Sequence, residues 1–420
     1  MKSMRNRKPI SFILVLCLLI GMASMTAYAD SFPATGSETE AQPMEPQIIE
    51  KSETTFSDMS GHWASTAVSK WAGLGVVKGD VRGFRPNDPI TRAEMAVILN
   101  NLMGYQTAAS NTFQDVNGSE WYASAILKTN AAGVLDGDGH GHANPALNIT
   151  REQAAVMLAR ALGVDADNGT KTSFRDAGTI SNWAKGFVFG MEEDKYIGGM
   201  GDGNFSPTSN ITRAQVVTML DNAVVAYFTS AGTYTQNALP KVSGGNCAVI
   251  VRTSGVIIKG ASIKGDLIVA EGVAQGEFTL NGATITGKMV VRGGGENSIE
   301  IINGSEVGGS VSVEKVGGKI RIVSNGKTIK ELDADSEVIL EGKFSNVSVA
   351  EGAAVDVRGQ IGNISVQAKA EVTISKDAKV DSLSVEKAAE GAKIEISGTV
   401  TSLKTDAPET DIIAKSTATI

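Results

Sequence analysis

The first half of the chain contains three segments in which apolar residues recur every three to four positions. Each segment opens with Ile-Thr-Arg, at residues 90–92, 149–151 and 211–213. This spacing is typical of an amphipathic helix. It predicts three helices, over Arg92–Met103, Arg151–Leu162 and 213–226.

Each of these predicted helices begins with the sequence pattern of a capping box. The pairs of cap and third helical residue are Thr91 and Glu94, Thr150 and Gln153, and Thr212 and Gln215. In a capping box the Thr hydroxyl accepts from the third helical N–H, and the Glu or Gln side chain reaches back to the Thr N–H. The isoleucine before each Thr stands where a hydrophobic staple is expected.

A further helix is predicted before each capped one, so that each unit consists of a helix, a loop and a capped helix. In the first unit Trp63, Ala67 and Trp71 share one helical face. The later units repeat this spacing with Trp121 and Ala125, and with Trp183, Phe187 and Met191. We expect most of these faces to be core. The first tryptophans lie 58 and 62 residues apart, and repeats of this length indicate stacked units.

The second half of the chain changes to short alternating runs rich in Val, Ile, Gly, Ser and Thr. Gly265, Gly287 and Gly309 open similar runs 22 residues apart, and later runs recur every 15 to 20 residues. Alternating strands at such a period favour a β-solenoid with one coil per repeat. A β-sandwich is the alternative, because its strands also recur at short intervals.

The N-terminus has the three parts of a secretory signal peptide. Four basic residues precede the apolar run 10–25, and Ala-Tyr-Ala at 27–29 is a cleavage site. Removing residues 1–29 changes the formal charge from −8 to −12, which argues against nucleic acid and anionic membranes as partners. Cys247 is then the only cysteine, so no intrachain disulfide is expected. No second apolar run is long enough to span a bilayer.

The arginine of each Ile-Thr-Arg segment is the candidate for chemistry. Arg92, Arg151 and Arg213 all fall at the first position of a helix, where a cation faces the positive end of the helix dipole. Helix N-termini bind anions, so one interpretation is an anion-binding corner used three times. The other interpretation is an arginine held by a neighbouring carboxylate or packed over an aromatic ring.

The order Phe-x-Asp, His-Trp-Ala, Gly-Asp, Phe-x-Pro and Ile-Thr-Arg-Ala-Glu within residues 56–94 resembles the S-layer homology (SLH) domain. Three copies cover roughly residues 54–228. The resemblance implies one all-α, pseudo-threefold assembly that uses no metal or organic cofactor. It also implies grooves that bind a secondary cell-wall polysaccharide with acidic, often pyruvylated, sugars. The implied glycan-binding candidates are Arg92, Arg151, Arg213, Trp63, Trp121, Trp183, Asp80 and Asp202.

The chemistry of such a ligand fits the arginines, because a pyruvate ketal is a carboxylate on a sugar and Arg offers it a planar bidentate fork. The copies differ in the loop before Ile-Thr-Arg, where Ala143 of the second copy replaces the usual Phe or Tyr. We therefore expect a weakened or altered second groove. His140 and His142 in that loop lack further ligands at metal spacing, so a solvated loop is expected there.

The expected organisation is multidomain, with an all-α SLH region followed by an all-β domain. Its parts are a signal peptide (1–29), a linker (30–53), repeats at 54–108, 111–165 and 172–228, a connector (229–245) and a β-solenoid-like domain (246–413).

The main functional hypothesis is a secreted, non-catalytic protein of the cell wall or surface layer. Its SLH repeats would bind a secondary cell-wall polymer, or peptidoglycan itself, and display the β-domain for self-association or for surface-layer partners. The alternative is a wall-anchored glycan-processing enzyme with its site in the β-domain. That domain lacks His, Trp and Tyr. Its acidic residues, such as Asp266, Glu271, Asp333 and Asp335, are interpreted as solvated charges at strand ends rather than a catalytic pair.

Overall fold

The computed structural model describes residues 56–164, 166, 171–239, 248–296 and 299–420. All of them belong to one compact unit, 44–420. The expected signal peptide, the linker 30–53 and Cys247 lie outside the described residues. None of the described helices is both long and apolar enough to cross a membrane.

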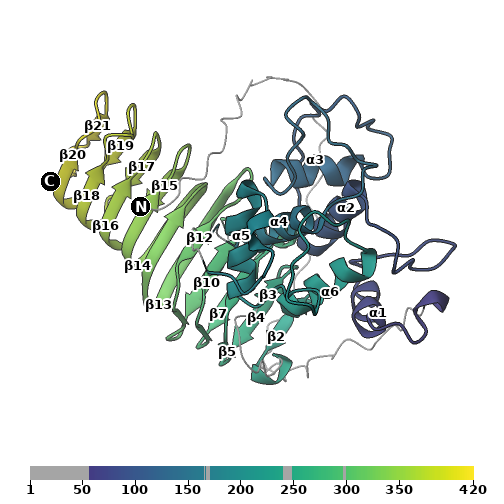
Figure 1. Cartoon of the computed structure of the whole chain (residues 1–420). Coiled ribbons are helices and arrows are strands. Elements are labelled where there is room, and N and C mark those ends of the chain that lie inside the picture. Colours follow the sequence, from purple (N-terminus) through teal and green to yellow (C-terminus); the bar gives the residue numbers. More distant parts are fainter. Residues whose placement is uncertain (1–55, 165, 167–170, 240–247, 297–298) are drawn as a thin grey trace, which may run out of the picture. The chain divides into compact units, whose positions relative to one another are not determined.

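The described helical region consists of three pairs of α-helices (Figure 1). The first helices of the pairs are α1 (Ser65–Gly73), α3 (Ala123–Ala131) and α5 (Asn182–Glu193). The capped helices are α2 (Arg92–Met103), α4 (Arg151–Leu162) and α6 (Arg213–Ala223). Short 3-10 turns occur at Ser57–Met59 and Ala177–Thr179. The predicted order of helix, loop and capped helix is confirmed.

The three predicted capping boxes are also confirmed. Thr91, Thr150 and Thr212 each accept from the third helical N–H, and Glu94, Gln153 and Gln215 each return to the Thr N–H. The prediction that the third helix reaches residue 226 is wrong. Helix α6 ends at Ala223, because Val224 and Val225 start strand β1 (Val224–Phe228), which pairs with a solenoid strand. β-Branched residues fit this extended, half-buried position better than a last helical turn.

The second half is a parallel β-solenoid of about nine turns within the described residues. One face contains β1, β3 (Ala248–Val251), β6 (Asp266–Val269), β9 (Met289–Val291), β12 (Val311–Val313), β16 (Gln360–Val366), β18 (Lys379–Val385), β20 (Thr399–Thr405) and the second parts of β13 (Lys319–Ala334) and β14 (Glu337–Val349). The opposite face contains β2 (Gly232–Tyr234), β4 (Val256–Lys259), β7 (Phe278–Asn281), β10 (Ile299–Ile302), the first parts of β13 and β14, β15 (Ala354–Val357), β17 (Glu371–Ile374), β19 (Lys393–Ile396) and β21 (Asp411–Ala414).

The early coils have a third side, formed by β5 (Ser262–Ile263), β8 (Thr284–Ile285) and β11 (Glu306–Val307). These coils are the ones with the 22-residue period, since Leu267 pairs with Met289 and Met289 pairs with Val311. In the later coils the spacing falls, and Leu332 pairs with Val347 only 15 residues on. A shorter coil has no residues left for a third strand. The β-sandwich alternative is wrong, because every pairing between the described strands is parallel.

The glycine column at the 22-residue period is required by close backbone contact. A Cβ at Gly287 would lie 2.1 Å from Oδ1 of Asp266 and 2.5 Å from the carbonyl oxygen of Gly265. Real Cβ atoms do not approach other atoms so closely, so a larger residue would push adjacent coils apart.

The solenoid begins directly after the last helix and packs against the helical region. Ala248, Ile250, Ile268, Ala270 and Val290 of the first coils belong to the same buried cluster as the helices. The stretch 229–245, expected to be a connector, contains β2, which pairs with β4 as part of the first coil. The two halves therefore share one core rather than being joined only by a linker.

Cationic side chains of the solenoid donate hydrogen bonds to backbone carbonyls at helix C-termini across this junction. Nη2 of Arg292 donates to the carbonyl of Arg160 at 3.0 Å, and its Nη1 donates to Ala161, both near the end of α4. Nε of Arg252 donates to Asn101 at 3.3 Å near the end of α2. Cations are favourable at this end of a helix, where carbonyl groups lack partners within the helix.

Two solenoid carboxylates were interpreted as solvated strand-end charges, and that prediction is wrong. Only 6% of Asp266 and 4% of Glu271 is exposed. Glu271 accepts from the backbone N–H of Gln106 at 3.0 Å, so it belongs to the junction with the helices. Burial raises the pKa of both carboxyl groups.

Candidate functional site

The three Ile-Thr-Arg segments meet in a closed ring of backbone hydrogen bonds. The N–H of Ile90 donates to the carbonyl of Ile211 at 3.0 Å, Ile149 donates to Ile90 at 3.1 Å, and Ile211 donates to Ile149 at 3.1 Å. All three isoleucines are buried. Each segment therefore needs the other two, which is the structural reason for three copies.

The first N–H groups of each capped helix are also used within this assembly. In α2 the N–H groups of Arg92 and Ala93 donate to the carbonyls of Leu147 and Pro145, at 2.9 and 3.0 Å. Helices α4 and α6 repeat this with carbonyls of the third and first repeats, respectively. With the third N–H bound to the Thr hydroxyl, the free helix-end N–H groups assumed for the anion-corner interpretation do not exist.

Each loop that precedes an Ile-Thr-Arg segment is held by the aspartate of Phe-x-Asp. Asp58 accepts from the N–H groups of Phe84 and Arg85, at 2.9 and 2.7 Å. Asp115 and Asp176 make the same pair of contacts in their repeats. The second donor always has a positive φ, at 59° for Arg85. These bonds stabilise a conformation that side chains rarely adopt.

The arginine of each repeat reaches into the loop of the next repeat, which creates three corners. We define the repeat-1 corner as the loop 78–88 with Arg213, the repeat-2 corner as the loop 136–147 with Arg92, and the repeat-3 corner as the loop 198–209 with Arg151. The sequence predicted the arginines, but not that each one completes a site in a different repeat.

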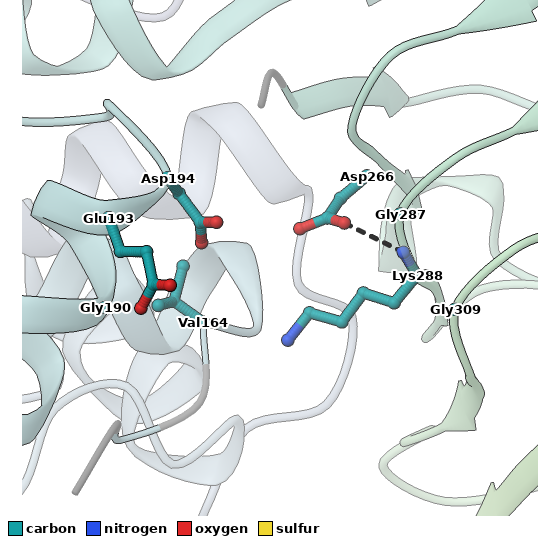
Figure 2. A pocket seen from close by; sticks show the side chains of 8 residues that line it. All are labelled: Val164, Gly190, Glu193, Asp194, Asp266, Gly287, Lys288 and Gly309. Atoms are coloured by element: carbon teal, nitrogen blue, oxygen red, sulfur yellow. Dashed lines mark hydrogen bonds between the residues drawn. The ribbon is translucent and has the colours of Figure 1, made fainter. Parts of the chain in front are cut away.

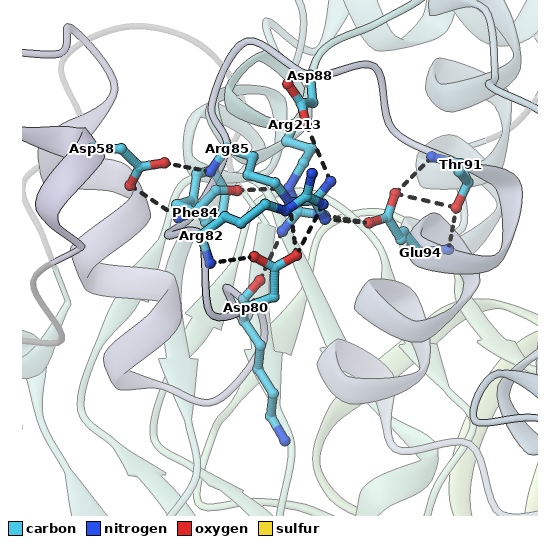
Figure 3. Close-up of polar contacts among 10 residues, drawn as sticks. Asp58, Asp80, Arg82, Phe84, Arg85, Asp88, Thr91, Glu94 and Arg213 are labelled. Atoms are coloured by element: carbon cyan, nitrogen blue, oxygen red, sulfur yellow. Dashed lines mark hydrogen bonds and ion pairs between the residues drawn. The ribbon is translucent and has the colours of Figure 1, made fainter.

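In the repeat-1 corner Arg213 is fully engaged (Figure 3). Its Nε donates to the carbonyl of Phe84 at 2.8 Å and its Nη2 donates to that of Lys78 at 2.7 Å. Its Nη1 lies 2.8 Å from Oε1 of Glu94, the capping-box residue of α2. The guanidinium also lies 4.9 Å from the centroid of the Phe84 ring.

A second cation and two further carboxylates complete this corner. Arg85 forms ion pairs with Asp80 at 3.0 Å, with Asp88 at 3.2 Å and with Glu94 at 3.2 Å. Burial lowers the pKa of Arg213, while Glu94 opposes this shift. The carboxylates of Asp80, Asp88 and Glu94 thus neutralise the two arginines of the repeat-1 corner. Glu94 and Arg85 were not among the predicted site residues.

The repeat-2 corner contains Arg92 and the loop in which Ala143 stands at the position of Phe84 and Phe205. Nε of Arg92 donates to the carbonyl of Ala143 at 2.7 Å, and its Nη2 donates to that of Asp136. Residue 143 is Ala, and no cation–π contact of Arg92 occurs within the described residues, unlike the contacts of Arg151 with Phe205 and of Arg213 with Phe84. Asp136 forms an ion pair with Arg160 at 2.6 Å. Burial lowers the pKa of Arg92, and the charges of Asp136, Asp138 and Asp115 oppose this.

In the repeat-3 corner the arginine is buried without a carboxylate partner among the described residues. Only 6% of Arg151 is exposed. Its Nη2 donates to the carbonyl of Gly198 at 2.8 Å, and its guanidinium lies 5.2 Å from the centroid of the Phe205 ring. Its buried Nε has no hydrogen-bond partner in the described part of the chain. Burial lowers the pKa of Arg151 to about 10.

The three candidate tryptophans lie at the surface, and Trp63 and Trp121 precede α1 and α3 rather than lying in them. The expectation that most of each face is core holds for the other members, since Ala67, Trp71, Ala125 and Met191 are buried. Trp63 is 64% exposed, Trp121 66% and Trp183 53%, whereas Trp71 is buried. The N–H of Ser181, two residues before Trp183, donates to Glu152, the residue after Arg151, at 2.9 Å. Trp63 lies near the repeat-1 corner through the contact between His62 and Asn87 at 3.4 Å.

The candidate aspartates of the loops have a clear local role. Oδ1 of Asp80 accepts from the N–H of Arg82 at 2.8 Å, and Oδ1 of Asp202 accepts from that of Asn204 at 2.8 Å. These backbone hydrogen bonds lower the pKa of both carboxyl groups. Asp138 does the same in the second repeat by accepting from His140 and His142. Asp80 and Asp202 therefore stabilise the backbone of the loops in the repeat-1 and repeat-3 corners.

The described residues contain no group of three or more His, Cys, Asp or Glu placed to hold a metal ion. A cavity of about 280 Å³ lies between the end of α5 and the first solenoid coils. Figure 2 shows Glu193 and Asp194 on its helical side, facing Asp266 and Lys288 of the solenoid. Oδ1 of Asp266 accepts from the N–H of Lys288 at 2.8 Å, and the Lys288 ammonium group donates to Gly163. The charged side chains of Asp266 and Lys288 in this cavity thus hold the helical region and the solenoid together.

Comparison with known proteins agrees with this geometry. Residues 55–96, 112–155 and 173–217 match the S-layer homology domain. The chain is 31% identical over 173 residues to an amylopullulanase of Thermoanaerobacterium thermosulfurigenes, covering 40% of this chain and 9% of that protein. It is 31% identical over 173 residues to the surface-layer 125 kDa protein of Lysinibacillus sphaericus, covering 40% and 14%. It is 30% identical over 150 residues to a cellulosome-anchoring protein of Acetivibrio thermocellus, covering 34% and 33%.

The chain spans no more than a third of the length of these relatives. The residues that match the S-layer homology domain lie in the helical half, where the ring of Ile-Thr-Arg segments, the capping boxes and the aspartate-held loops recur three times. This protein therefore carries three S-layer homology domains, within residues 55–217, followed by a parallel β-solenoid.

Proposed function

We propose that this is a non-catalytic cell-surface protein whose three SLH domains bind a secondary cell-wall polysaccharide bearing acidic sugars. The observation that carries this proposal is the set of three exposed tryptophans, one in each repeat. Trp is enriched at binding interfaces, because it combines a large apolar ring with a polar N–H group. A Trp ring can pack on the apolar face of a sugar, while an arginine nearby receives a carboxylate.

The threefold arrangement adds a reason for binding a polymer rather than a single sugar. Three sites on one rigid ring can engage one glycan chain at several points, and linked weak contacts multiply the apparent affinity. Two of the relatives are by name a surface-layer protein and a cellulosome-anchoring protein. Their names support an anchoring role here, with the solenoid as the displayed module.

The test uses residues 30–420, sedimented with purified cell-wall sacculi that retain or lack their secondary polymer. The triple variant Trp63→Ala, Trp121→Ala and Trp183→Ala should lose most binding to complete sacculi, because the ring faces are gone. Folding should be kept, since these side chains are exposed. Ile413→Ala, an exposed apolar residue of the solenoid, is the matched control and should bind as wild type does.

Substitution of the three arginines by Ala is a less clear test, because each one also holds the loop of the next repeat. Equal binding to complete and polymer-free sacculi would instead identify peptidoglycan as the ligand. Wild-type binding by the tryptophan triple variant would overturn the assignment of the sites.

A glycan-processing enzyme remains the second candidate, and the cavity of Figure 2 is the place to test it, because it gathers Glu193, Asp194 and Asp266. If the chain has hydrolytic activity on wall glycans, Asp266→Asn should abolish it. Under the non-catalytic proposal, neither wild type nor variant releases reducing sugar from sacculi.

A further inference from the structure

We propose that the contact between the helical region and the first solenoid coils is pH-sensitive, and that protonation of Glu271 tightens this contact whereas ionisation of Glu271 loosens it. The inference does not depend on which ligand the SLH domains bind. It makes the acidity of the surroundings a control on how firmly the solenoid is held against the SLH region.

Glu271 lies directly at this contact. It opens the short 3-10 turn Glu271–Val273 after strand β6, and its Oε2 accepts from the N–H of Gln106 at 3.0 Å. Because Gln106 follows helix α2, this hydrogen bond joins the solenoid to the helical region. The next residue, Thr107, donates from its hydroxyl to the carbonyl of Val316 at 3.0 Å. The segment after α2 is thus bound by two parts of the solenoid, and one of the binding groups is a carboxyl group.

The ionised form of Glu271 is poorly compensated in this position. Only 4% of the residue is exposed, and its Oε1 is buried without a hydrogen-bond partner in the described part of the chain. The hydroxyl of Tyr105, the residue before Gln106, is buried there and also lacks a partner. Burial removes the hydration of an ionised carboxylate, and an oxygen without a donor leaves that loss unreplaced. The neutral carboxyl group loses much less.

The solenoid cations near Glu271 are engaged with other groups. Nη2 of Arg292 pairs with Glu314 at 3.0 Å, and the same guanidinium donates to carbonyls at the end of α4. The ammonium group of Lys315 donates to the carbonyl of Gly294. Their charges act on Glu271 from nearby, but neither group donates a hydrogen bond to its free oxygen.

Burial therefore decides the protonation balance of this carboxyl group. It raises the pKa of Glu271, while the hydrogen bond from Gln106 and the nearby cations oppose this shift without outweighing it. The charged and titratable groups around Glu271, from the elements packed against it, are Tyr105 after α2, Lys128 of α3, and Arg252, Arg292, Glu314 and Lys315 of the solenoid.

The sign of the pH effect follows from this raised pKa. Glu271 binds a proton more tightly in the folded protein than in the unfolded chain. The resulting stabilisation is complete below the unfolded value of about 4.3, and it is lost as the pH rises through the folded value. Separation of the solenoid from the helices also hydrates the carboxyl group, so the same linkage applies to local opening of the junction.

Only the first coils depend on this contact. Ile268 and Val290 point outward from their strands and are buried in the same cluster as the helices. The same column of positions continues with Ser312, Asp333 and Ser348, which are polar. Loosening of the junction therefore exposes apolar residues of the first coils, while the later coils keep their own contacts.

An isosteric variant tests the inference through stability. Glu271→Gln keeps an acceptor for the N–H of Gln106 but cannot ionise, so it imitates the protonated acid at every pH. We expect its urea midpoint to exceed that of wild type at about pH 8 and to match it near about pH 4.5, where wild type is mostly protonated at this position. Glu390→Gln, at an exposed position of a later coil, is the control with the same change in charge and should follow wild type.

A second variant separates the charge from the unsatisfied polar atoms of the same cluster. Tyr105→Phe removes the other unpartnered buried group without removing the carboxyl group. Its difference from wild type should be the same at both pH values, because the hydroxyl of Tyr105 does not ionise in this range.

Hydrogen exchange shows whether the effect belongs to the junction. After correction for intrinsic exchange rates, residues 104–109 and 266–273 of wild type should exchange several-fold faster at about pH 8 than at about pH 5, and residues 380–396 should not. In Glu271→Gln, the junction segments should exchange at the same corrected rate at both pH values.

Three results would overturn the inference. A Glu271→Gln variant that is less stable than wild type at about pH 8 would show that the ionised carboxylate stabilises the junction. Junction exchange in wild type that does not change with pH would show that Glu271 does not control the contact, even if the Gln variant fails to fold. Equal changes in residues 380–396 would show a general loss of stability rather than local opening.

Discussion

The arginines of the Ile-Thr-Arg segments combine the two interpretations that their sequence left open. Each one is held by backbone carbonyls of the next repeat, as a structural residue would be. Their electrostatic surroundings nevertheless differ, because Arg213 forms an ion pair with Glu94, whereas no carboxylate among the described residues pairs with Arg151. The carboxylate that pairs with Arg213 belongs to Glu94, which the sequence presents only as a capping-box residue.

At the same scale, the Phe-x-Asp aspartate should make stability depend on acid. Burial favours a higher pKa for Asp58, but hydrogen bonds from the N–H groups of Phe84 and Arg85 outweigh it, so its pKa is lowered. A lowered folded-state pKa contributes stability above the unfolded value of about 3.9, and this is lost as the pH falls through the folded value. Asp58→Asn should therefore be less stable than wild type at pH 7, with a gap that narrows below about pH 4.

Urea denaturation at several pH values measures this gap. Leu147→Ala, at an exposed position of the second loop, is a control whose difference from wild type should not change with pH. A gap for Asp58→Asn that stays constant down to pH 3 would contradict the assigned role of the carboxylate.

At the scale of the element, each capped helix draws its N-terminal hydrogen bonds from two sources. The Thr hydroxyl and the Glu or Gln side chain are local, while the carbonyls that accept the first two N–H groups belong to another repeat. The local part could be predicted from four consecutive residues. The distant part could not, because Arg151 and Ser209 are far apart in the sequence.

The cap of α4 gives a prediction at this scale. Thr150→Ala removes the acceptor of the Gln153 N–H and should lower the free energy of unfolding by about 1 kcal/mol. Thr150→Ser keeps the hydroxyl and should be close to wild type. Hydrogen exchange should show faster opening of the first turn of α4 in the Ala variant alone, and equal exchange in both variants would argue against the cap.

At the scale of the whole molecule, the helical region and the solenoid share a core and a set of buried ionic contacts. Arg292 pairs with Glu314 at 3.0 Å and also caps the end of α4. Both side chains are buried. The solenoid's position on the SLH region is thereby fixed by contacts and not only by the length of a linker.

Arg292→Met should therefore weaken both halves together. The change removes the buried ion pair between Arg292 and Glu314, and breaking such a pair on one side costs about 3–5 kcal/mol, whereas adding Glu314→Leu should restore much of the loss. The four tryptophans all precede residue 184, so their fluorescence reports the helical region, while circular dichroism also follows the strands. Coincident transitions by both signals are expected in wild type, and widely separated ones would show that the halves unfold independently.

The sequence by itself determined the features that depend on neighbours in the chain or on a regular period. The starts of α2, α4 and α6 at residues 92, 151 and 213 follow from contacts between positions three apart. The solenoid follows from an alternation that repeats every 15 to 22 residues. Both signals are local enough to be read without knowing the fold.

Tertiary structure alone decided which side chains meet in the ring of Ile-Thr-Arg segments and at the junction between the helices and the solenoid. Arg213 and Glu94 are 119 residues apart, and Glu271 and Gln106 are 165 apart. No propensity or spacing relates such pairs, because closure of the threefold ring and docking of the first coils bring them together. For the same reason, the sequence named the three arginines but could not show that Arg213 pairs with a carboxylate while Arg151 has none among the described residues.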